Sequence, residues 1–384
     1  IMDGNYFVYS RLFVLPRDKN TRFLDTEKDR GMFMRKLALD FASEMRKFKN
    51  IANRVVFVAD SKSWRKDMIP EAQYKANRKQ SDTINWTAVF EIYDEFKELL
   101  KKRNVIVQQM PGAEGDDLVF AWSTFLNMQG DNCIIWSGDR DLMQLVNYNP
   151  ANDAYSVCYD STRKVMGVYP GYTKWLSSRT NKAEDDIFNI SAVYVDDMIK
   201  QEIERWIKSN KIKLWPIYCD EFIFTKILTG DKSDNISSVV QVVKQTKTGK
   251  TRTTRVSDNK AALILKEFKS KHRRMSAVYL FDDEYKNDIC TIIKRVMKSE
   301  TPIIDLRLKL EQNIKLMLLH TATIPDAIQT AMFEAVKKDS SIAIGQYEGL
   351  LDKDDILEST KHVAKNYIPK SMDPFANSDT NTLF

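Results

Sequence analysis

An alternation of short apolar segments with amphipathic stretches constrains the fold of this chain more than any other feature. The segments "RVVFVAD", "NVIVQQM" and "CIIWSGD" are typical of buried strands, and the apolar pair before Asp3 is typical of a strand end. Between them, residues 28–50, residues 83–103 and a segment starting near Glu114 carry apolar residues at helical spacing. The resulting order β-α-β-α-β-α-β predicts an α/β fold in which helices flank a mainly parallel central sheet.

Acidic residues follow the ends of these strands. Because ligands bind beyond the carboxyl ends of parallel strands, we expect the acids near these ends to share one rim of the sheet. A further acidic group lies in "LTGDKSDNI". The five clusters contain Asp3; Asp60; Glu114, Asp116 and Asp117; Asp139 and Asp141; and Asp231 and Asp234.

A single acidic pair is weak evidence, because acids at helix starts are stabilised by the helix dipole and commonly do nothing more. Five clusters on one rim are different, since crowded carboxylates repel and take up protons unless cations neutralise them. Oxygen ligands suit Mg²⁺, for which Mn²⁺ can substitute. Two such ions about 4 Å apart can promote phosphodiester hydrolysis without a serine, cysteine or histidine nucleophile.

Basic residues gather in two segments of a chain whose net charge is +6. One, "SWRKDMIPEAQYKANRKQ", follows Asp60, and the other, "KQTKTGKTRTTR", contains no acid. The alternative interpretation is a pair of solvated loops, but near an acidic metal site we favour phosphate binding, with Tyr74 or Trp64 stacking on an unpaired base. The expected nucleic-acid contacts are Arg65, Lys66, Tyr74, Lys79, Lys244, Lys247, Lys250, Arg252 and Arg255.

Other features narrow the class of protein. No apolar run reaches the roughly 18 residues of a membrane span, so we expect a soluble protein. Four scattered cysteines and three distant histidines argue against zinc and disulfides and favour the cytoplasm. Since Asp3 follows the first residue so closely, we expect that the true beginning is missing.

The five motifs resemble those of the 5′ nuclease family, which comprises the flap endonucleases, the 5′ nuclease domain of bacterial DNA polymerase I and the bacteriophage ribonuclease H enzymes. The chain has "MDGN", "VADSKSWRKDMIPEAQYKANR", "GAEGDDLV", "SGDRDLMQLV" and "GDKSDNI" in the family's order. The resemblance covers about residues 1–150 and 220–236. It implies a PIN-like fold and 5′ to 3′ exonuclease or flap endonuclease activity.

The resemblance also implies roles for individual residues. Asp3, Asp60, Glu114 and Asp116 would bind a first Mg²⁺, with Asp117 supporting them. Asp139, Asp141, Asp231 and Asp234 would bind a second Mg²⁺, and the catalytic cations Lys75 and Arg78 would reach the scissile phosphate. Ser233 and Asn235 would shape the last turn.

The chain departs from the family after "GDKSDNI", where the usual glycine-rich turn is replaced by "ISSVVQVVKQTKTGKTRTTR". This departure is similar to that of the phage ribonuclease H enzymes. Basic side chains would then hold duplex in place of backbone amides. The expected divisions are a nuclease core at 1–160 with a basic arch near 61–82, an insertion of unknown role at 161–215, a helical duplex-binding part at 216–340 that completes the metal site, and a C-terminal region at 341–384 with a mobile tail.

The expected substrates are DNA and RNA:DNA hybrids with a 5′ single-stranded end or flap, and the expected biology is primer and flap removal in phage DNA replication. We expect a monomer, located in the host cell cytoplasm if phage-encoded, whose tail ending in "NTLF" could dock on a sliding clamp or a single-strand-binding protein. One alternative is a non-catalytic nucleic-acid-binding protein that retains the fold. Another, a haloacid dehalogenase-type phosphatase, is disfavoured because Asn5 stands where that class needs its acid.

Overall fold

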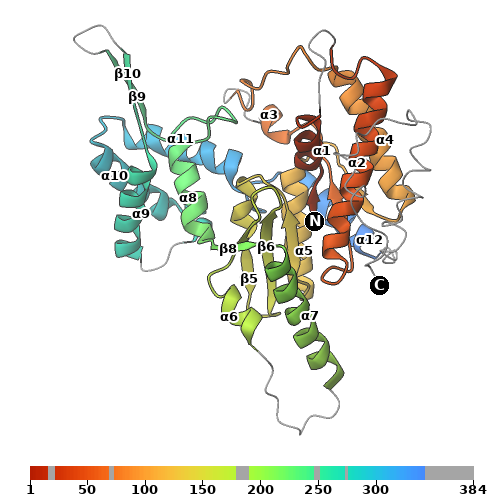
Figure 1. Cartoon of the computed structure of the whole chain (residues 1–384). Helices are drawn as coiled ribbons and strands as arrows, with labels where there is room; N and C mark the ends of the chain where they lie inside the picture. The colour runs from red at the N-terminus through yellow and green to blue at the C-terminus, as the bar shows by residue number, and fades with distance from the viewer. Residues whose placement is uncertain (16–21, 69–72, 179–189, 246–250, 273–275, 342–384) are drawn as a thin grey trace.

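The computed structural model of the 384-residue chain describes residues 1–15, 22–68, 73–178, 190–245, 251–272 and 276–341. Within these ranges, the side chains of residues 190–196, 242–245 and 251–252 are not described. Figure 1 shows a central sheet flanked by helices, with a group of helices to one side. The predicted α/β class with a mainly parallel sheet and a helical C-terminal part is confirmed.

The central sheet has the strand order β3-β2-β1-β4-β6-β7-β8, and β5 pairs with β6. β1, β2, β3, β4 and β6 are parallel to one another, whereas β7 and β5 run antiparallel to β6. The strands are β1 (Met2–Asp3), β2 (Val56–Val58), β3 (Ile106–Gln108), β4 (Cys133–Trp136), β5 (Asn147–Asn149), β6 (Ala154–Asp160), β7 (Val165–Val168) and β8 (Lys213–Pro216).

Helices cover both faces of this sheet. The core on one face includes α1 (Gly4–Leu12), α2 (Glu27–Phe48), α4 (Trp86–Lys102) and residues of α7 (Ile190–Ser209). The core on the other face includes α5 (Gly115–Gln129) and α12 (Asp326–Ser340), where the rings of Phe120 and Phe333 lie 6.4 Å apart. Side chains of β2 alternate between the two cores, with Phe57 in one and Val56 and Val58 in the other, as expected for a strand buried on both faces.

The predicted helices begin at recognisable caps. Thr26 caps α2 and Asn85 caps α4, each through a side-chain oxygen. Glu114 and Asp117 form a capping box at the start of α5, which ends at Gly130 in the left-handed conformation. Two acids of the candidate site are therefore also helix-start residues.

The segment 161–215 continues the sheet. It contributes β7, α6 (Tyr172–Ser177), α7 and β8, and β7 pairs with β6. The expected boundary at residue 160 therefore falls inside the sheet, because strands that pair through backbone hydrogen bonds belong to one unit. Sequence periodicity missed this because β7 and β8 are only four residues each.

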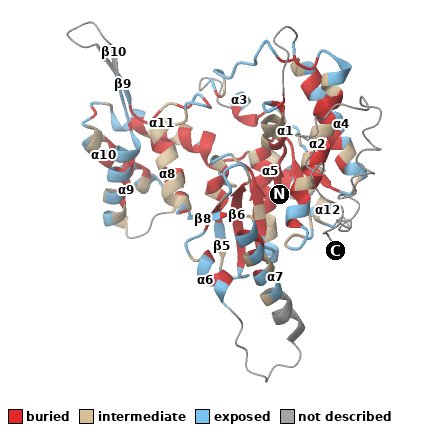
Figure 2. Cartoon of the chain, viewed as in Figure 1, coloured by how far each residue is buried: buried red, intermediate tan, exposed pale blue. Residues whose placement is uncertain are grey.

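A separate helical part has its own core. It contains α8 (Cys219–Thr229), α9 (Asp258–His272), α10 (Asp283–Met297) and α11 (Ile303–Met317). The antiparallel strands β9 (Gln241–Gln245) and β10 (Thr251–Arg255) project from it (Figure 1). Buried residues concentrate in the sheet and on the inward faces of the helices around it (Figure 2). α12 leaves this part and packs on α5, so the expected 216–340 unit is shared between two cores.

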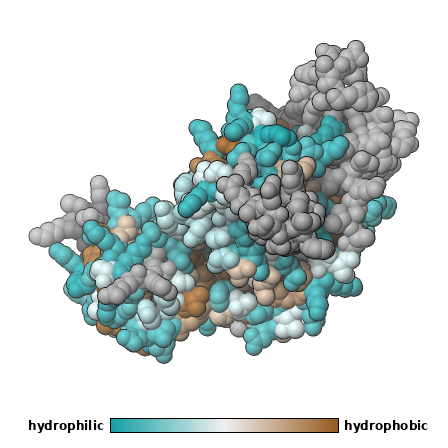
Figure 3. All heavy atoms as spheres, turned by 90° about the horizontal axis from the view of Figure 1, so that it is seen from below, coloured by the Kyte–Doolittle hydropathy of each residue, from teal (hydrophilic) through white to brown (hydrophobic). Residues whose placement is uncertain are grey.

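The described helices include none that is long and apolar enough to span a bilayer. The face shown in Figure 3 is predominantly hydrophilic, with smaller hydrophobic areas between the polar residues.

Candidate active site

Four acids from distant parts of the sequence meet at one edge of the sheet. Asp3 ends β1 and caps α1, Asp60 follows β2, Asp116 lies in the first turn of α5, and Asp139 follows β4. β1, β2 and β4 are neighbouring parallel strands, so their carboxyl ends lie side by side. We call Asp3, Asp60, Asp116 and Asp139 the inner acids.

The inner acids influence one another electrostatically. Burial raises the pKa of Asp3 to about 7, with further contributions from Asp60 and Asp139. Burial also raises the pKa of Asp116 well above its usual range, with Asp139 and Asp3 adding to the effect. In the described part of the chain none of the inner acids forms an ion pair, although the charge of Lys75 acts on Asp60 and Asp116. A group of this kind favours binding of a cation.

Hydrogen bonds fix the positions of two inner acids. Asp3 accepts from the Tyr6 backbone N–H at 3.0 Å and from Ser137 Oγ at 2.8 Å. Asp60 accepts from the Gly115 N–H at 2.5 Å and from the side chain of Asn5. A side chain at position 115 would place its Cβ 2.8 Å from Asp60 Oδ1, so glycine is required for this approach.

The other five acids all form ion pairs. We call Glu114, Asp117, Asp141, Asp231 and Asp234 the outer acids. Glu114 pairs with Arg65 and Lys75, Asp117 with Arg65, Asp234 with Arg78, and Asp141 and Asp231 both with Lys226.

These partners lower the pKa values of two outer acids. Burial raises the pKa of Glu114, but Lys75 and Arg65 more than reverse this effect, and the net pKa lies below its usual value. The pKa of Asp231 falls to about 2 because hydrogen bonds from Lys226 and Ser233 outweigh its burial. Asp141 differs, since burial outweighs Lys226 and raises its pKa to about 6.

Arg65 was predicted to bind nucleic acid, and this is wrong. Its side chain is 2% exposed and donates to Glu114 Oε2 at 2.9 Å, to Asp117 Oδ1 at 2.8 Å and to the Leu316 carbonyl at 3.1 Å. A guanidinium that is buried and held by two carboxylates and a carbonyl is not accessible to a phosphate on the surface. Arg65 instead connects α3 (Trp64–Met68) to the start of α5 and to the end of α11 through these hydrogen bonds.

The predicted stacking role of Tyr74 or Trp64 is also wrong. Tyr74 is 7% exposed and donates to Glu114 Oε2 at 3.1 Å, and Trp64 is 4% exposed and donates to Asp117 Oδ2 at 3.2 Å. Both aromatic side chains are therefore buried core residues, which is the alternative to base stacking. The local sequence could not separate the two interpretations, because the partners are 40 and 53 residues away.

The stretch "LTGDKSDNI" forms a turn that holds the basic segment next to the acids. Gly230 has φ +73°, and a Cβ there would lie 2.5 Å from the Ile236 carbonyl. The Lys75 N–H donates to the Asp234 carbonyl at 2.9 Å, and Asn235 Nδ2 donates to the Gln73 carbonyl at 3.0 Å. The turn thus holds the chain around Lys75 in place. Ser233 donates to Asp231 at 2.6 Å and so stabilises the turn.

Comparison with known proteins agrees with this geometry. Residues 1–169 match the family described as 5′-3′ exonuclease, N-terminal resolvase-like domain. The chain is 30% identical over 151 residues to a 5′-3′ exonuclease of Buchnera aphidicola, covering 39% of this chain and 49% of that protein. It is 31% identical over 158 residues to a 5′-3′ exonuclease of Aquifex aeolicus, covering 40% of this chain and 51% of that protein.

Residues 1–169 therefore resemble the 5′-3′ exonucleases. The resemblance recognised from the sequence motifs is confirmed over these residues, and the chain spans about half the length of the curated relatives it matches. The crystal structure of the T5 D15 protein co-crystallized with metal ions matches with a TM-score of 0.52 and 15% identity, covering 88% of this chain and 98% of that one. At this identity the match shows a shared fold.

The remaining predicted nucleic-acid contacts are either exposed or lie outside the described residues. Lys66, Lys79 and Arg255 are exposed. Lys244 and Arg252 face each other across the β9–β10 pair, but their side chains lie outside the described residues. Lys247, Lys250 and the C-terminal tail also lie outside the described residues.

Motif reasoning missed two residues of the site, Lys226 and Tyr93. Lys226 contacts two outer acids, and Tyr93 donates at 2.9 Å to Asn5, which in turn holds Asp60. The only sequence signal for Lys226 is its place in the last turn of α8, five residues before Asp231. Tyr93 carries no such signal, because it matches the apolar face of α4.

The donor set of the inner acids fits a hard cation. Over the described ranges, no three His, Cys, Asp or Glu side chains are arranged to hold a metal ion among themselves. Mg²⁺ does not need such a cage, because it is usually bound by one or two carboxylates together with waters and substrate phosphates. The inner acids meet that requirement, because their charges act on one another and none of them forms an ion pair within the described ranges.

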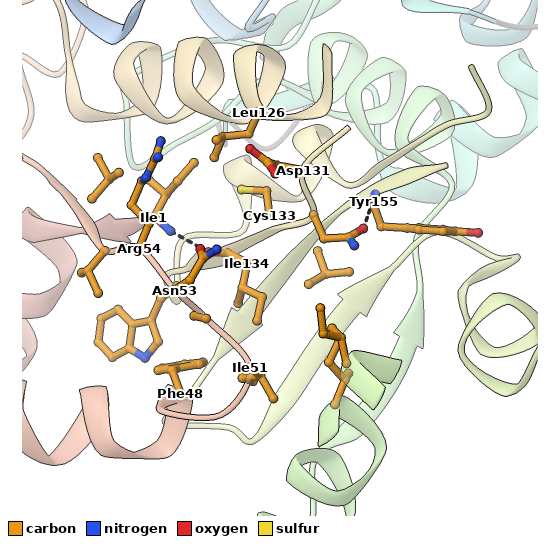
Figure 4. A pocket seen from close by; sticks show the side chains of 18 of the residues that line it. Ile1, Phe48, Ile51, Asn53, Arg54, Leu126, Asp131, Cys133, Ile134 and Tyr155 are labelled. Carbon is orange, nitrogen blue, oxygen red and sulfur yellow. Dashed lines mark hydrogen bonds between the residues drawn. The ribbon is translucent and has the colours of Figure 1, made fainter. Parts of the chain in front are cut away.

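A cavity of about 680 Å³ lies elsewhere in the molecule (Figure 4). It is lined by residues such as Ile1, Arg54, Cys133 and Tyr155, which lie near the amino ends of β1, β2, β4 and β6. This is the edge of the sheet opposite the inner acids, so the cavity contributes no residue to the candidate active site.

Proposed function

We propose that this chain is a metal-dependent 5′ nuclease that hydrolyses phosphodiesters at the 5′ ends or flaps of DNA and RNA:DNA hybrids. The observation that carries the proposal is the group of inner acids, which come from four segments to one sheet edge and form no ion pair among the described residues. Buried carboxylates that repel one another are stabilised in their charged form by a bound cation. The similarity of residues 1–169 to 5′-3′ exonucleases suggests that the reaction is phosphodiester hydrolysis.

The inner acids would hold the divalent cation, for which we propose Mg²⁺, with Mn²⁺ as a substitute. When bound, such ions neutralise the charge that develops on a phosphate and activate water for attack. The T5 D15 protein, which shares the fold, was crystallized with metal ions and gives independent support. Asn5 and Gly115 orient Asp60, while Ser137 orients Asp3.

Lys75 and Arg78 are the proposed contacts to the scissile phosphate. Lys75 lies within electrostatic range of Asp60 and Asp116, and the backbone of residue 75 is held by the turn at Asp234. Both cations now pair with outer acids, so contact with phosphate would require each to exchange a carboxylate for a phosphate oxygen.

The exposed cations Lys66 and Lys79 would follow the single-stranded 5′ end, and the β9–β10 hairpin would hold duplex. The double variant Lys250→Ala with Arg252→Ala tests the hairpin. We expect weaker binding and a flatter dependence of binding on salt concentration. An unchanged salt dependence would remove the duplex-binding role.

A labelled-substrate assay tests the proposed activity. A 5′-labelled flap or an RNA:DNA hybrid is incubated with Mg²⁺ and either wild type, Asp139→Ala or the control Glu98→Gln, whose side chain is 62% exposed on α4. We expect cleavage by wild type and by the control, and loss of cleavage in Asp139→Ala. Cleavage by all three proteins, or by none, would contradict the assignment and favour a non-catalytic nucleic-acid-binding protein.

The biological role that fits this activity is removal of RNA primers and flaps during phage DNA replication, similar to that of the phage ribonuclease H enzymes. A clamp or a single-strand-binding protein is the proposed partner of the C-terminal tail. Clamp binding measured with and without residues 372–384 tests that contact.

A further inference from the structure

Lys226 holds two outer acids that the motif comparison assigns to a second metal ion. Its Nζ donates to Asp231 Oδ2 at 2.8 Å and also to Asp141 Oδ1. The two acids are 90 residues apart and reach the same ammonium from the segment after β4 and from the turn after α8. The cation is thus shared between them.

The position of Lys226 makes this contact a stable part of the fold. The residue lies in the last turn of α8, and only 19% of its side chain is exposed. Ser233 adds two hydrogen bonds to the other oxygen of Asp231, from its N–H at 2.7 Å and its hydroxyl at 2.6 Å. Both oxygens of Asp231 are therefore engaged, whereas a cation could bind Asp116 without displacing any described ion-pair partner.

We propose that the Lys226 ammonium is a built-in counter-ion that competes with divalent cations for Asp141 and Asp231. This inference rests on the proposed metal-dependent function. It adds the order in which two divalent ions would bind. A first ion would bind at the inner acids, and a second would have to displace Lys226 or share its carboxylates. The second ion should therefore bind more weakly, because two cations repel strongly at contact distance.

Calorimetric titration of the metal-free full chain with MnCl₂ tests the proposal. We expect wild type to show one tighter and one weaker binding event. In Lys226→Met, which keeps the unbranched apolar stem of the side chain but removes the charge, the weaker event should tighten by about tenfold or more while the tighter event stays unchanged. A weaker event that is unaffected or further weakened in Lys226→Met would overturn the proposal, as would two equally tight events in wild type.

Two further variants keep the result interpretable. Lys226→Arg retains the charge and should keep the weaker event weak. Asp231→Asn should remove the weaker event and leave the tighter one, which gives a second test if Lys226→Met does not fold. Flap cleavage is measured separately, so the absence of cleavage would count against the proposed function, whereas an unchanged Mn²⁺ titration would count against the role of Lys226.

Discussion

The inner and outer acids lie within one site and have opposite environments. Every outer acid has a basic partner, and in two of them that partner helps to lower the pKa. The inner acids have no ion-pair partner within the described ranges, and the pKa values of Asp3, Asp60 and Asp116 are raised. Acids that look alike in the sequence motifs therefore divide into those that the fold neutralises and those that it leaves available to a cation.

Removing the partner of two outer acids should give the largest effect. Arg65→Met leaves Glu114 and Asp117 buried without their guanidinium, which we expect to lower the free energy of unfolding by about 3–5 kcal/mol. Urea unfolding monitored by circular dichroism measures the change. The exposed neighbour Lys66→Met is the control and should stay within about 0.5 kcal/mol of wild type. Equal effects of the two substitutions would show that Arg65 is not a structural residue.

The inner acids should make stability fall with rising pH when no metal is present. The pKa of Asp3 is about 7 in the folded protein, above its ordinary value of 3.8, so the folded state binds more protons than the unfolded state between these values. Stability should therefore be greatest below about pH 4 for this group and decline up to about pH 7, by an amount on the order of 2–4 kcal/mol. Urea midpoints in EDTA across this range measure it, and Asp3→Asn should flatten the decline. If the stability of wild type relative to Asp3→Asn rose between about pH 4 and pH 7, the result would contradict the account.

A single inner acid and a single outer acid should respond in opposite directions to the same substitution. Asp116→Asn removes a repelling charge and should raise the stability of the metal-free protein by about 1 kcal/mol. Asp117→Asn, one position along, breaks the pair with Arg65 and should lower stability. Thermal unfolding in EDTA compares the two variants. If both variants lost stability, the charge of Asp116 would be stabilised by partners within the fold, contrary to the account.

The smallest effect is expected at the basic segment. Lys79→Ala removes one exposed cation and should weaken nucleic-acid binding slightly, with the slope of log binding constant against log salt reduced by about 1. Fluorescence anisotropy at several salt concentrations measures the slope. If Lys79→Ala left the slope unchanged, the exposed part of this segment would not contact phosphate.

The sequence predicted the sheet and the acidic rim because both follow from local patterns. Helical spacing of Phe33, Leu37 and Phe41 placed α2, and the acids that end β1, β2 and β4 followed from the alternation of elements. The sequence could not show which acids are neutralised. Arg65, Lys75 and Lys226 contact acids that lie 39 to 85 residues away in the sequence. The contact of Lys226 with Asp231, five residues away, is the exception. It also could not place α12 on α5, which depends on packing between two helices that lie far apart in the sequence.

Crystals of the full chain soaked in MnCl₂ test the central claim most directly, because the anomalous signal of manganese locates the ion without reference to activity. We predict the strongest peak beside Asp116 and its neighbours Asp3, Asp60 and Asp139, with a weaker peak or none beside Asp141 and Asp231. A strongest peak at Asp141 and Asp231, or no peak near Asp116, would contradict the account.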